Sequence, residues 1–348
     1  MDHKELYKFG SGIHMATSTT LCSPCSVRHI TKPSTYWCSE CEEAICDDCQ
    51  EHHKVLKATR SHELIPIESS SICLIRANDK QAHLQVTPTK TINDLKLILQ
   101  KEITSHCENV KGCCMSVNGE YLFIDDFSKT LNVIAPDGTF KYKMMLSPSD
   151  GFDITFIDEK TFAITSGFSY EHFGFDIIDI ESREKKQFIN LPGRPFGITR
   201  DQDTLFVCVE GLGIYKVNTF DYTTLHVVSC NLSSGSYVSV FNDNIFCTDL
   251  DDDSVVCYDL EGSRVWRFED DSVLDRPRGI TVDIGGHVFV VGEDSSNVAI
   301  ISNDGKLHRQ ILTKEHGLFE PSAISFHKKT GKFFVANTNK IAFLYSVT

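Results

Sequence analysis

The sequence contains no run of about 18 apolar residues, the length that a membrane-spanning helix requires, so no membrane span is expected. The first 20 residues mix polar side chains and hold no apolar stretch, which argues against a secretory signal peptide. Positive charge is scarce as well, because 34 Lys and Arg face 48 Asp and Glu among 348 residues, for a net charge of -14. We therefore expect a cytoplasmic protein, in which stable disulfides are rare.

Cysteine, by contrast, is plentiful, with 14 residues, and six of them lie close together near the N-terminus. They form three Cys-x2-Cys pairs that are followed by histidines: Cys22, Cys25, Cys38, Cys41, Cys46, Cys49, His52, His53 and His62. A Cys-x2-Cys pair presents two thiolates to one tetrahedral ion, as structural zinc requires. A redox or disulfide cluster is the alternative, but redox pairs of this kind occur singly. Three pairs and two histidines supply eight ligands, enough for two closed zinc sites, although spacing alone does not say which pairs share an ion.

The stretch "CSPC…WCSECEEAICDDCQEHH…TRSHELI" resembles the B-box zinc finger of the tripartite-motif family over residues 20–66. The resemblance implies two structural Zn²⁺ ions in a cross-brace and no catalytic residue. One ion would be held by Cys22, Cys25, Cys46 and Cys49, and the other by Cys38, Cys41, His53 and His62. His53 is preferred to His52 because the family usually leaves three residues between the last cysteine and this histidine.

Two parts of the tripartite motif have no counterpart here. Residues 67–93 are polar and keep no heptad of apolar positions, which predicts a linker in place of a coiled coil. The 21 residues before Cys22 contain no cysteine, so they cannot form a RING domain, and residues 1–19 are predicted to be disordered. We therefore expect no ubiquitin ligase activity from this chain by itself.

The rest of the sequence repeats. Six segments align on an apolar residue that is followed directly by a hydroxyl: Met115-Ser116, Ile154-Thr155, Ile198-Thr199, Val238-Ser239, Ile280-Thr281 and Ile324-Ser325. Short β-rich runs with turn signals between them fill each interval of about 40 residues, which predicts four-stranded blades of a β-propeller. The stretch PRGITVD at 277–283 resembles an NHL-type blade. The fold predicted for residues 94–348 is a six-bladed, all-β, NHL-like propeller.

The sixth repeat supplies only three strands before the last residue, Thr348. The segment LKLILQKEI at 95–103 has the look of a fourth strand, and we expect it to pair with the C-terminal strand and close the ring. Closure would remove two open sheet edges, which otherwise favour aggregation. The alternative is a short helix left over from the missing coiled coil.

The sequence bears on three classes of function for the propeller. RNA binding is an alternative that charge disfavours, because residues 111–348 hold 34 acidic and 22 basic side chains and no basic cluster. Catalysis at a metal in the axial channel would need carboxylates or histidines that recur between blades, but the aligned positions offer only Asp153, and no base recurs beside the hydroxyls. We therefore expect an interaction protein and not an enzyme.

The B-box of such a protein would serve assembly or docking on a RING-bearing ligase, and its propeller would select a client protein. The family resemblance implies regulation of ubiquitination or innate immunity.

Four residues beside the aligned positions are the candidate partner-binding set: Phe152, Phe196, Tyr237 and Arg278. Arginine and aromatic side chains are enriched at interaction hot spots, so we expect these four to lie on one rim of the channel. The alternatives are that the phenylalanines pack in the core and that Arg278 pairs with Glu293 or Asp294.

Overall fold

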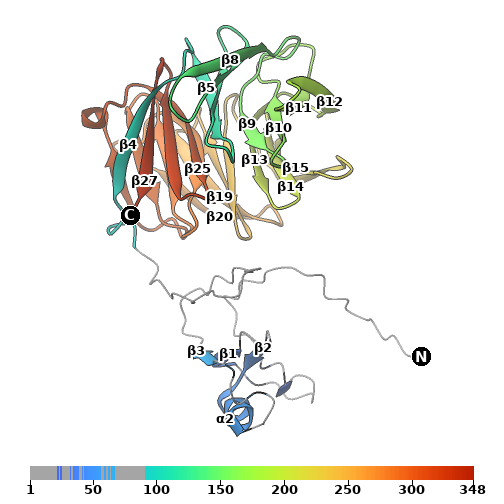
Figure 1. Ribbon diagram of the computed structural model, residues 1–348, viewed down its shortest axis with the longest axis vertical. Coiled ribbons are helices and arrows are strands. Elements are labelled where there is room, and N and C mark those ends of the chain that lie inside the picture. Colours follow the sequence, from blue (N-terminus) through green and yellow to red (C-terminus); the bar gives the residue numbers. More distant parts are fainter. Residues whose placement is uncertain are drawn as a thin grey trace. The chain divides into compact units, whose positions relative to one another are not determined.

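The computed structural model describes residues 91–348 and, nearer the N-terminus, residues 22, 24–25, 32, 34–38, 41, 43–55, 59, 62 and 64–66. The chain divides into two compact units, Met1–Thr89 and Lys90–Thr348 (Figure 1). The predicted disordered segment 1–19 lies outside the described residues, as does the predicted linker 67–93 apart from its last three positions. None of the helices in the described part of the chain has the length and apolar content that a membrane span requires.

The described part of the N-terminal unit includes a small sheet and the helix α2. Its antiparallel sheet has the order β2-β1-β3, formed by β1 (Tyr36–Cys38), β2 (Glu43–Ile45) and β3 (Leu64–Pro66), and helix α2 (Asp47–Val55) follows β2. Asp47 and Asp48 lie in the first turn of the helix, where carboxylates favour the positive end of the helix dipole. Its buried cluster consists mainly of cysteines, joined by Ile45 and by the partly buried Tyr36 and Leu64. Among the described residues of this unit, so few apolar side chains supply little core for independent folding.

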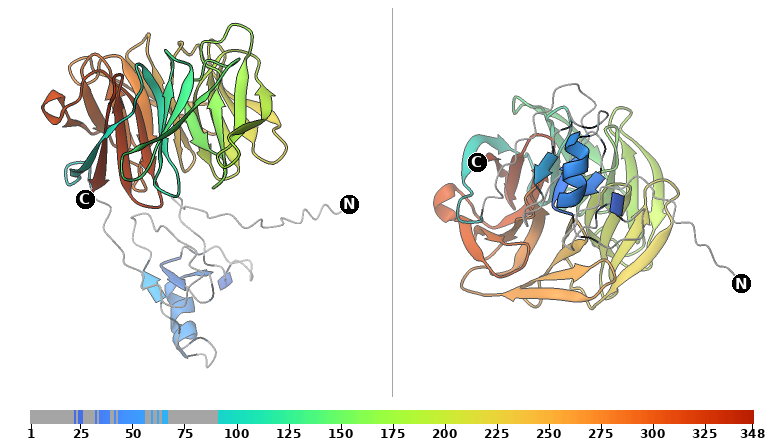
Figure 2. Two further views of the ribbon diagram at one scale, coloured as in Figure 1. Left: turned by 45° about the horizontal axis from the view of Figure 1, so that its top comes forward. Right: turned by 90° about the horizontal axis from the view of Figure 1, so that it is seen from below.

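The C-terminal unit consists of six antiparallel sheets of four strands each, arranged radially (Figure 2), which confirms the predicted six-bladed propeller. Five blades are continuous in sequence. The first is β5 (Val110–Met115), β6 (Tyr121–Asp125), β7 (Thr130–Ile134) and β8 (Phe140–Met145); the second is β9 (Ile154–Phe156), β10 (Thr161–Thr165), β11 (Gly174–Asp179) and β12 (Glu184–Asn190). The third is β13 (Pro195–Asp201), β14 (Thr204–Val209), β15 (Gly213–Asn218) and β16 (Thr224–Ser229); the fourth is β17 (Val238–Phe241), β18 (Asn244–Asp249), β19 (Ser254–Asp259) and β20 (Arg264–Glu269). The fifth is β21 (Pro277–Val282), β22 (Val288–Gly292), β23 (Asn297–Ile301) and β24 (His308–Leu312), after which a short 3-10 helix, η1 (Lys314–His316), leads to the sixth.

The sixth blade is built from both ends of the propeller sequence. It contains β25 (Pro321–His327), β26 (Lys332–Asn337), β27 (Ile341–Val347) and β4 (Leu97–Thr104). β4 pairs antiparallel with β27, from Ile341 opposite Thr104 to Val347 opposite Leu97, and Figure 1 shows the two strands side by side. The predicted closure of the ring is therefore confirmed, with the strand two residues later at its start and one residue later at its end than the predicted segment 95–103. Ile92, placed in the linker by the predicted boundary, is buried in the same cluster as Leu95 and Tyr345.

The first strand of each blade contacts its counterparts in the neighbouring blades, so the ring is tight around its axis. Glycines make this approach possible. A Cβ atom on Gly197 would lie 2.4 Å from the Cα of Tyr237, and one on Gly112 would lie 2.7 Å from the carbonyl oxygen of Phe152. Both distances are shorter than non-bonded atoms allow, so the repeat needs glycine at these positions because neighbouring backbones meet there.

Candidate metal centres and propeller channel

Two groups of cysteine and histidine side chains lie in the N-terminal unit. The first group is Cys22, Cys25, Cys46 and Cys49, and within it the four ligand atoms lie within 4.8 Å of one another. The Sγ of Cys25 is 3.8 Å from that of Cys46 and 3.6 Å from that of Cys49. A tetrahedral ion with Zn–S bonds of about 2.3 Å holds its sulfurs about 3.8 Å apart, so these distances fit one shared zinc ion.

The second group is Cys38, Cys41, His53 and His62, and its ligand atoms meet the same limit. The Sγ of Cys41 is 3.8 Å from Nε2 of His53 and 3.3 Å from Nδ1 of His62, and the Sγ of Cys38 is 3.6 Å from the same Nδ1. A tetrahedral zinc ion places sulfur and nitrogen ligands about 3.5 Å apart. The first group offers four sulfur atoms, and the second offers two sulfur atoms and two nitrogen atoms. Both donor sets are those of structural zinc, so the two clusters fit two Zn²⁺ ions.

Local structure explains how these side chains come together. Cys49 and His53 are four residues apart on α2, hence on one face of the helix, and they are its buried residues. His52 is exposed on another face of the helix, so the structure brings His53 and not His52 into the second group. The two groups interleave along the chain. In sequence order, the first and third pairs of ligands form one group, and the second and fourth pairs form the other. The resemblance implied this cross-brace, while spacing alone left the pairing open.

The four side chains predicted to form a binding rim lie elsewhere, in the core of the propeller. Phe152 and Phe196 are completely buried and Tyr237 is 3% exposed. The ring centroids of Phe152 and Phe196 are 5.0 Å apart, and so are those of Phe152 and Tyr237. The Tyr237 hydroxyl donates a hydrogen bond of 2.6 Å to the carbonyl of Lys111, which lies across the channel in another blade of the propeller. These aromatic side chains therefore fill the channel and present no rim, because several blades converge on this point.

Arg278 is buried as well, with 8% of its surface exposed. Its Nε and Nη2 both lie 2.8 Å from Oε2 of Glu293, which also lies 3.5 Å from Nη2 of Arg276. The predicted pairing with Glu293 is thus present. A guanidinium that is held this way neutralises a buried carboxylate and has little surface left for a partner, so the binding-rim placement of Arg278 is corrected too.

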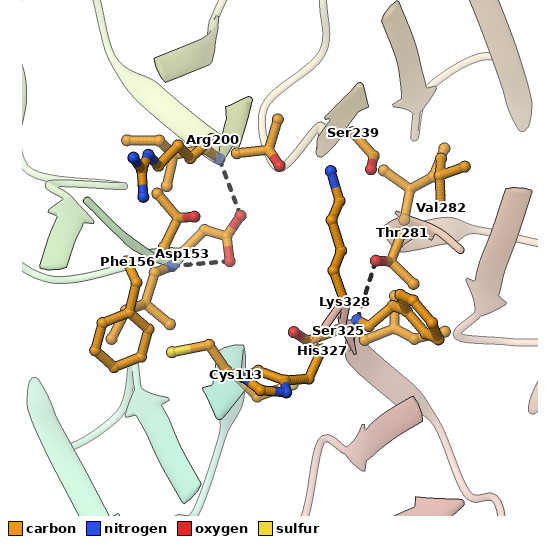
Figure 3. A pocket seen from close by; sticks show the side chains of 18 of the residues that line it. Cys113, Asp153, Phe156, Arg200, Ser239, Thr281, Val282, Ser325, His327 and Lys328 are labelled. Atoms are coloured by element: carbon orange, nitrogen blue, oxygen red, sulfur yellow. Dashed lines mark hydrogen bonds between the residues drawn. The ribbon is translucent and has the colours of Figure 1, made fainter. Parts of the chain in front are cut away.

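Beyond the aromatic side chains, the channel contains a pocket of about 430 Å³. All six blades contribute to its walls through residues at or next to their first strands, and Figure 3 shows them around an open centre. The aligned apolar residues of the repeat line it together with most of the hydroxyls that follow them: Met115, Ile154, Ile198, Val238, Ile280 and Ile324, with Thr155, Thr199, Ser239, Thr281 and Ser325. The sequence repeat therefore marks the wall of this pocket.

Asp153, a carboxylate that does not recur at the equivalent positions of the other blades, also lines the pocket. Its Oδ1 accepts a hydrogen bond of 2.9 Å from the backbone N–H of Ile154, and its Oδ2 accepts one of 2.9 Å from the backbone N–H of Ile198 (Figure 3). Burial raises the pKa of Asp153 to about 7, and the two backbone donors oppose that shift. A search for residues shared by all blades overlooks a side chain that occurs in one blade. The signal in the sequence that could have indicated a role for Asp153 is its position next to the aligned Ile154.

Comparison with known proteins supports the division into two units. Residues 21–64 match the ANCHR-like B-box zinc-binding domain. No curated protein sequence matches the chain. Among solved structures, the chain is similar to virginiamycin B lyase from Staphylococcus aureus, with 13% identity, 72% of this chain and 99% of that chain covered, and a TM-score of 0.53. It is also similar to XC5397 from Xanthomonas campestris, a gluconolactonase, with 12% identity, 74% and 91% covered, and a TM-score of 0.57. At such identities these structures share the fold alone.

Proposed function

We propose that this chain is an adaptor of tripartite-motif type, in which the B-box docks on a RING-bearing ligase or assembles with further copies and the propeller selects a client protein. The chain combines a zinc-binding B-box with a six-bladed propeller, two modules typical of protein interaction. The observation that carries the proposal is the pair of closed Cys and His clusters, because four protein ligands at each ion leave no position for water or substrate. The B-box then acts through its surface.

The finer parts of the proposal rest on the family resemblance. We assign the first zinc ion to Cys22, Cys25, Cys46 and Cys49 and the second to Cys38, Cys41, His53 and His62, within a B-box at 20–66 and before a propeller at 94–348. We further propose a cytoplasmic location, an NHL-type propeller, and a role in regulating ubiquitination during innate defence. These assignments follow from the resemblance and are open to direct test.

Two neighbouring histidines supply a matched pair of variants for the test. We expect His53→Ala to lower the zinc content from two ions per chain, because it removes a ligand, whereas His52→Ala should keep both ions because its side chain is exposed. Elemental analysis of the purified proteins gives the zinc content.

In affinity capture followed by mass spectrometry, a RING-bearing ligase should accompany the wild type and His52→Ala but not His53→Ala. Equal capture by all three proteins would refute docking through the B-box.

A further inference from the structure

The channel pocket is closed at one end and accessible at the other. Its closed end, which we call the floor, is formed by Cys113, Asp153 and Tyr237, and the ring of Phe152 packs behind Tyr237. Its other end, which we call the mouth, includes the exposed residues Val117, Gln202, Lys328 and Lys329. A ligand would therefore enter from one side and meet a floor that carries a carboxyl group.

The carboxyl group of Asp153 has no cationic side chain against it. Among the described residues, no Lys, Arg or His lies within ion-pair distance of it, and its two hydrogen bonds come from backbone N–H groups. The titratable groups that sense its charge are the thiols of Cys113, Cys114 and Cys208 and the phenol of Tyr237. Burial raises the pKa of all four, so they are neutral at neutral pH. The carboxylate is thus fixed in place, faces a cavity and lacks a counter-ion.

The walls carry hydroxyl groups that are available for hydrogen bonding. Within the described part of the chain, the side-chain hydroxyls of Thr155, Thr199, Ser239 and Ser325 make no hydrogen bond to protein. Only the fifth, that of Thr281, accepts one, at 3.1 Å from the backbone N–H of Phe326. Apolar side chains of the aligned positions line the same pocket. The walls therefore suit a ligand with a hydrogen-bonding head and an apolar chain.

Cationic side chains lie at the mouth, together with acidic partners of its two lysines. Lys328 extends toward the middle of the opening, with Arg200 and His327 around it (Figure 3). The Nζ of Lys328 lies 3.7 Å from Oδ1 of Asp201, and Nε of Arg200 donates a hydrogen bond to the carbonyl of Gln202. Lys329 is paired with Glu159 at 2.9 Å. Burial lowers the pKa of His327, so the cations that a second positive charge on a ligand would approach here are Lys328 and Arg200.

We propose that this pocket binds a small organic amine, with its single primary ammonium group against Asp153 and its apolar chain along the wall toward the mouth. The ammonium group supplies the counter-ion that the carboxylate lacks and donates further hydrogen bonds to the wall hydroxyls. The cations of the mouth select against diamines and in favour of a carboxylate at the far end. This inference goes beyond the adaptor role and does not depend on it.

Four six-carbon probes test the proposal by isothermal titration of the zinc-loaded full-length protein. Hexylamine should bind, 6-aminohexanoate should bind at least as tightly, 1,6-diaminohexane should bind several-fold more weakly, and hexanoate should not bind. Tri-alanine with a free amino group distinguishes a peptide N-terminus as the source of the ammonium. Binding of hexanoate, or of tri-alanine without hexylamine, would overturn the proposal, and so would the absence of any amine binding at millimolar concentration.

Variants at the floor and the mouth locate the binding. Asp153→Asn should weaken hexylamine at least tenfold, and Asp203→Asn, which changes an exposed carboxylate next to the mouth residue Gln202, should leave it unchanged. Lys328→Glu alters an exposed side chain, so it keeps the test independent of any folding defect in Asp153→Asn. It should reverse the preference, so that 1,6-diaminohexane binds more tightly than 6-aminohexanoate. An unchanged order of the probes in Lys328→Glu would refute the assignment to this pocket.

Discussion

Arg278 and Glu293 form an ion pair in which both residues are only 8% exposed. We predict that Arg278→Met lowers the free energy of unfolding by about 3–5 kcal/mol, because Glu293 would stay buried with only the partly exposed Arg276 as partner. Arg278→Met combined with Glu293→Gln should cost less than the sum of the single changes. Arg267→Met, in a pair with the exposed Asp252, is the control, with about 1 kcal/mol or less. Urea denaturation measures all four; additive losses at 278 and 293 would contradict the coupling.

The placement of these central residues could not be read from the repeat. Alignment of the blades places Phe152, Phe196 and Arg278 at one level along the channel, and in the structure these residues do lie at that level. The alignment does not show that side chains from several blades fill the channel at this level, because the filling depends on the size of each side chain.

The raised pKa of Asp153 predicts a pH dependence of stability. An unfolded aspartate titrates near 3.9, whereas the folded group titrates at about 7. Between these values the folded state binds more protons than the unfolded state, so this group makes stability fall as pH rises from about 4 to 7. In Asp153→Asn this contribution is absent. The stability of the variant relative to wild type should therefore rise over this window, as urea denaturation at several pH values would show, and a constant difference would contradict the raised pKa.

Among the elements, β4 depends on a single buried side chain. Ile103 is 1% exposed and packs in the cluster of Phe334 and Leu344, whereas Ile98 on the same strand is 50% exposed. We predict that Ile103→Ala destabilises the propeller by about 2–5 kcal/mol, because it leaves a cavity in a packed core. Ile98→Ala should stay within about 0.5 kcal/mol of wild type. Thermal and urea unfolding of the two variants compare them directly, and equal losses would mean that β4 is held by its backbone pairing alone.

Elements proved more accessible to sequence analysis than sites. The six-fold spacing of apolar and hydroxyl residues predicted the number of blades, and the missing fourth strand of the last repeat predicted β4, because ring closure follows from strand counting. Cysteine spacing predicted two zinc sites, because each Cys-x2-Cys pair presents two thiolates to one ion, whereas the division of the ligands between the two ions came from the family resemblance. The pocket around Asp153 does not follow, because it depends on residues from all six blades and on a backbone approach that only the closed ring produces.

At the level of the whole molecule, the two units should respond differently to metal removal. We predict that a strong chelator unfolds residues 20–66 and leaves the propeller folded, because the N-terminal unit has little core besides its cysteines and zinc binding supplies its folding energy. Circular dichroism and limited proteolysis of the chelated protein provide the measurement, with the zinc-loaded protein as control. An N-terminal unit that stays resistant to protease without metal would contradict this.

The pairing of β4 with β27 also has a consequence for synthesis on the ribosome. Gln100 on β4 donates a hydrogen bond to Ser346 on β27, which lies 246 positions later in the chain. At translation rates of about 5–20 residues per second, the earlier strand waits roughly 12–50 s for its partner to emerge. During that time every blade but the last can form while the ring stays open. A message truncated anywhere before β27 would therefore leave an unpaired sheet edge that chaperones and proteases can recognise.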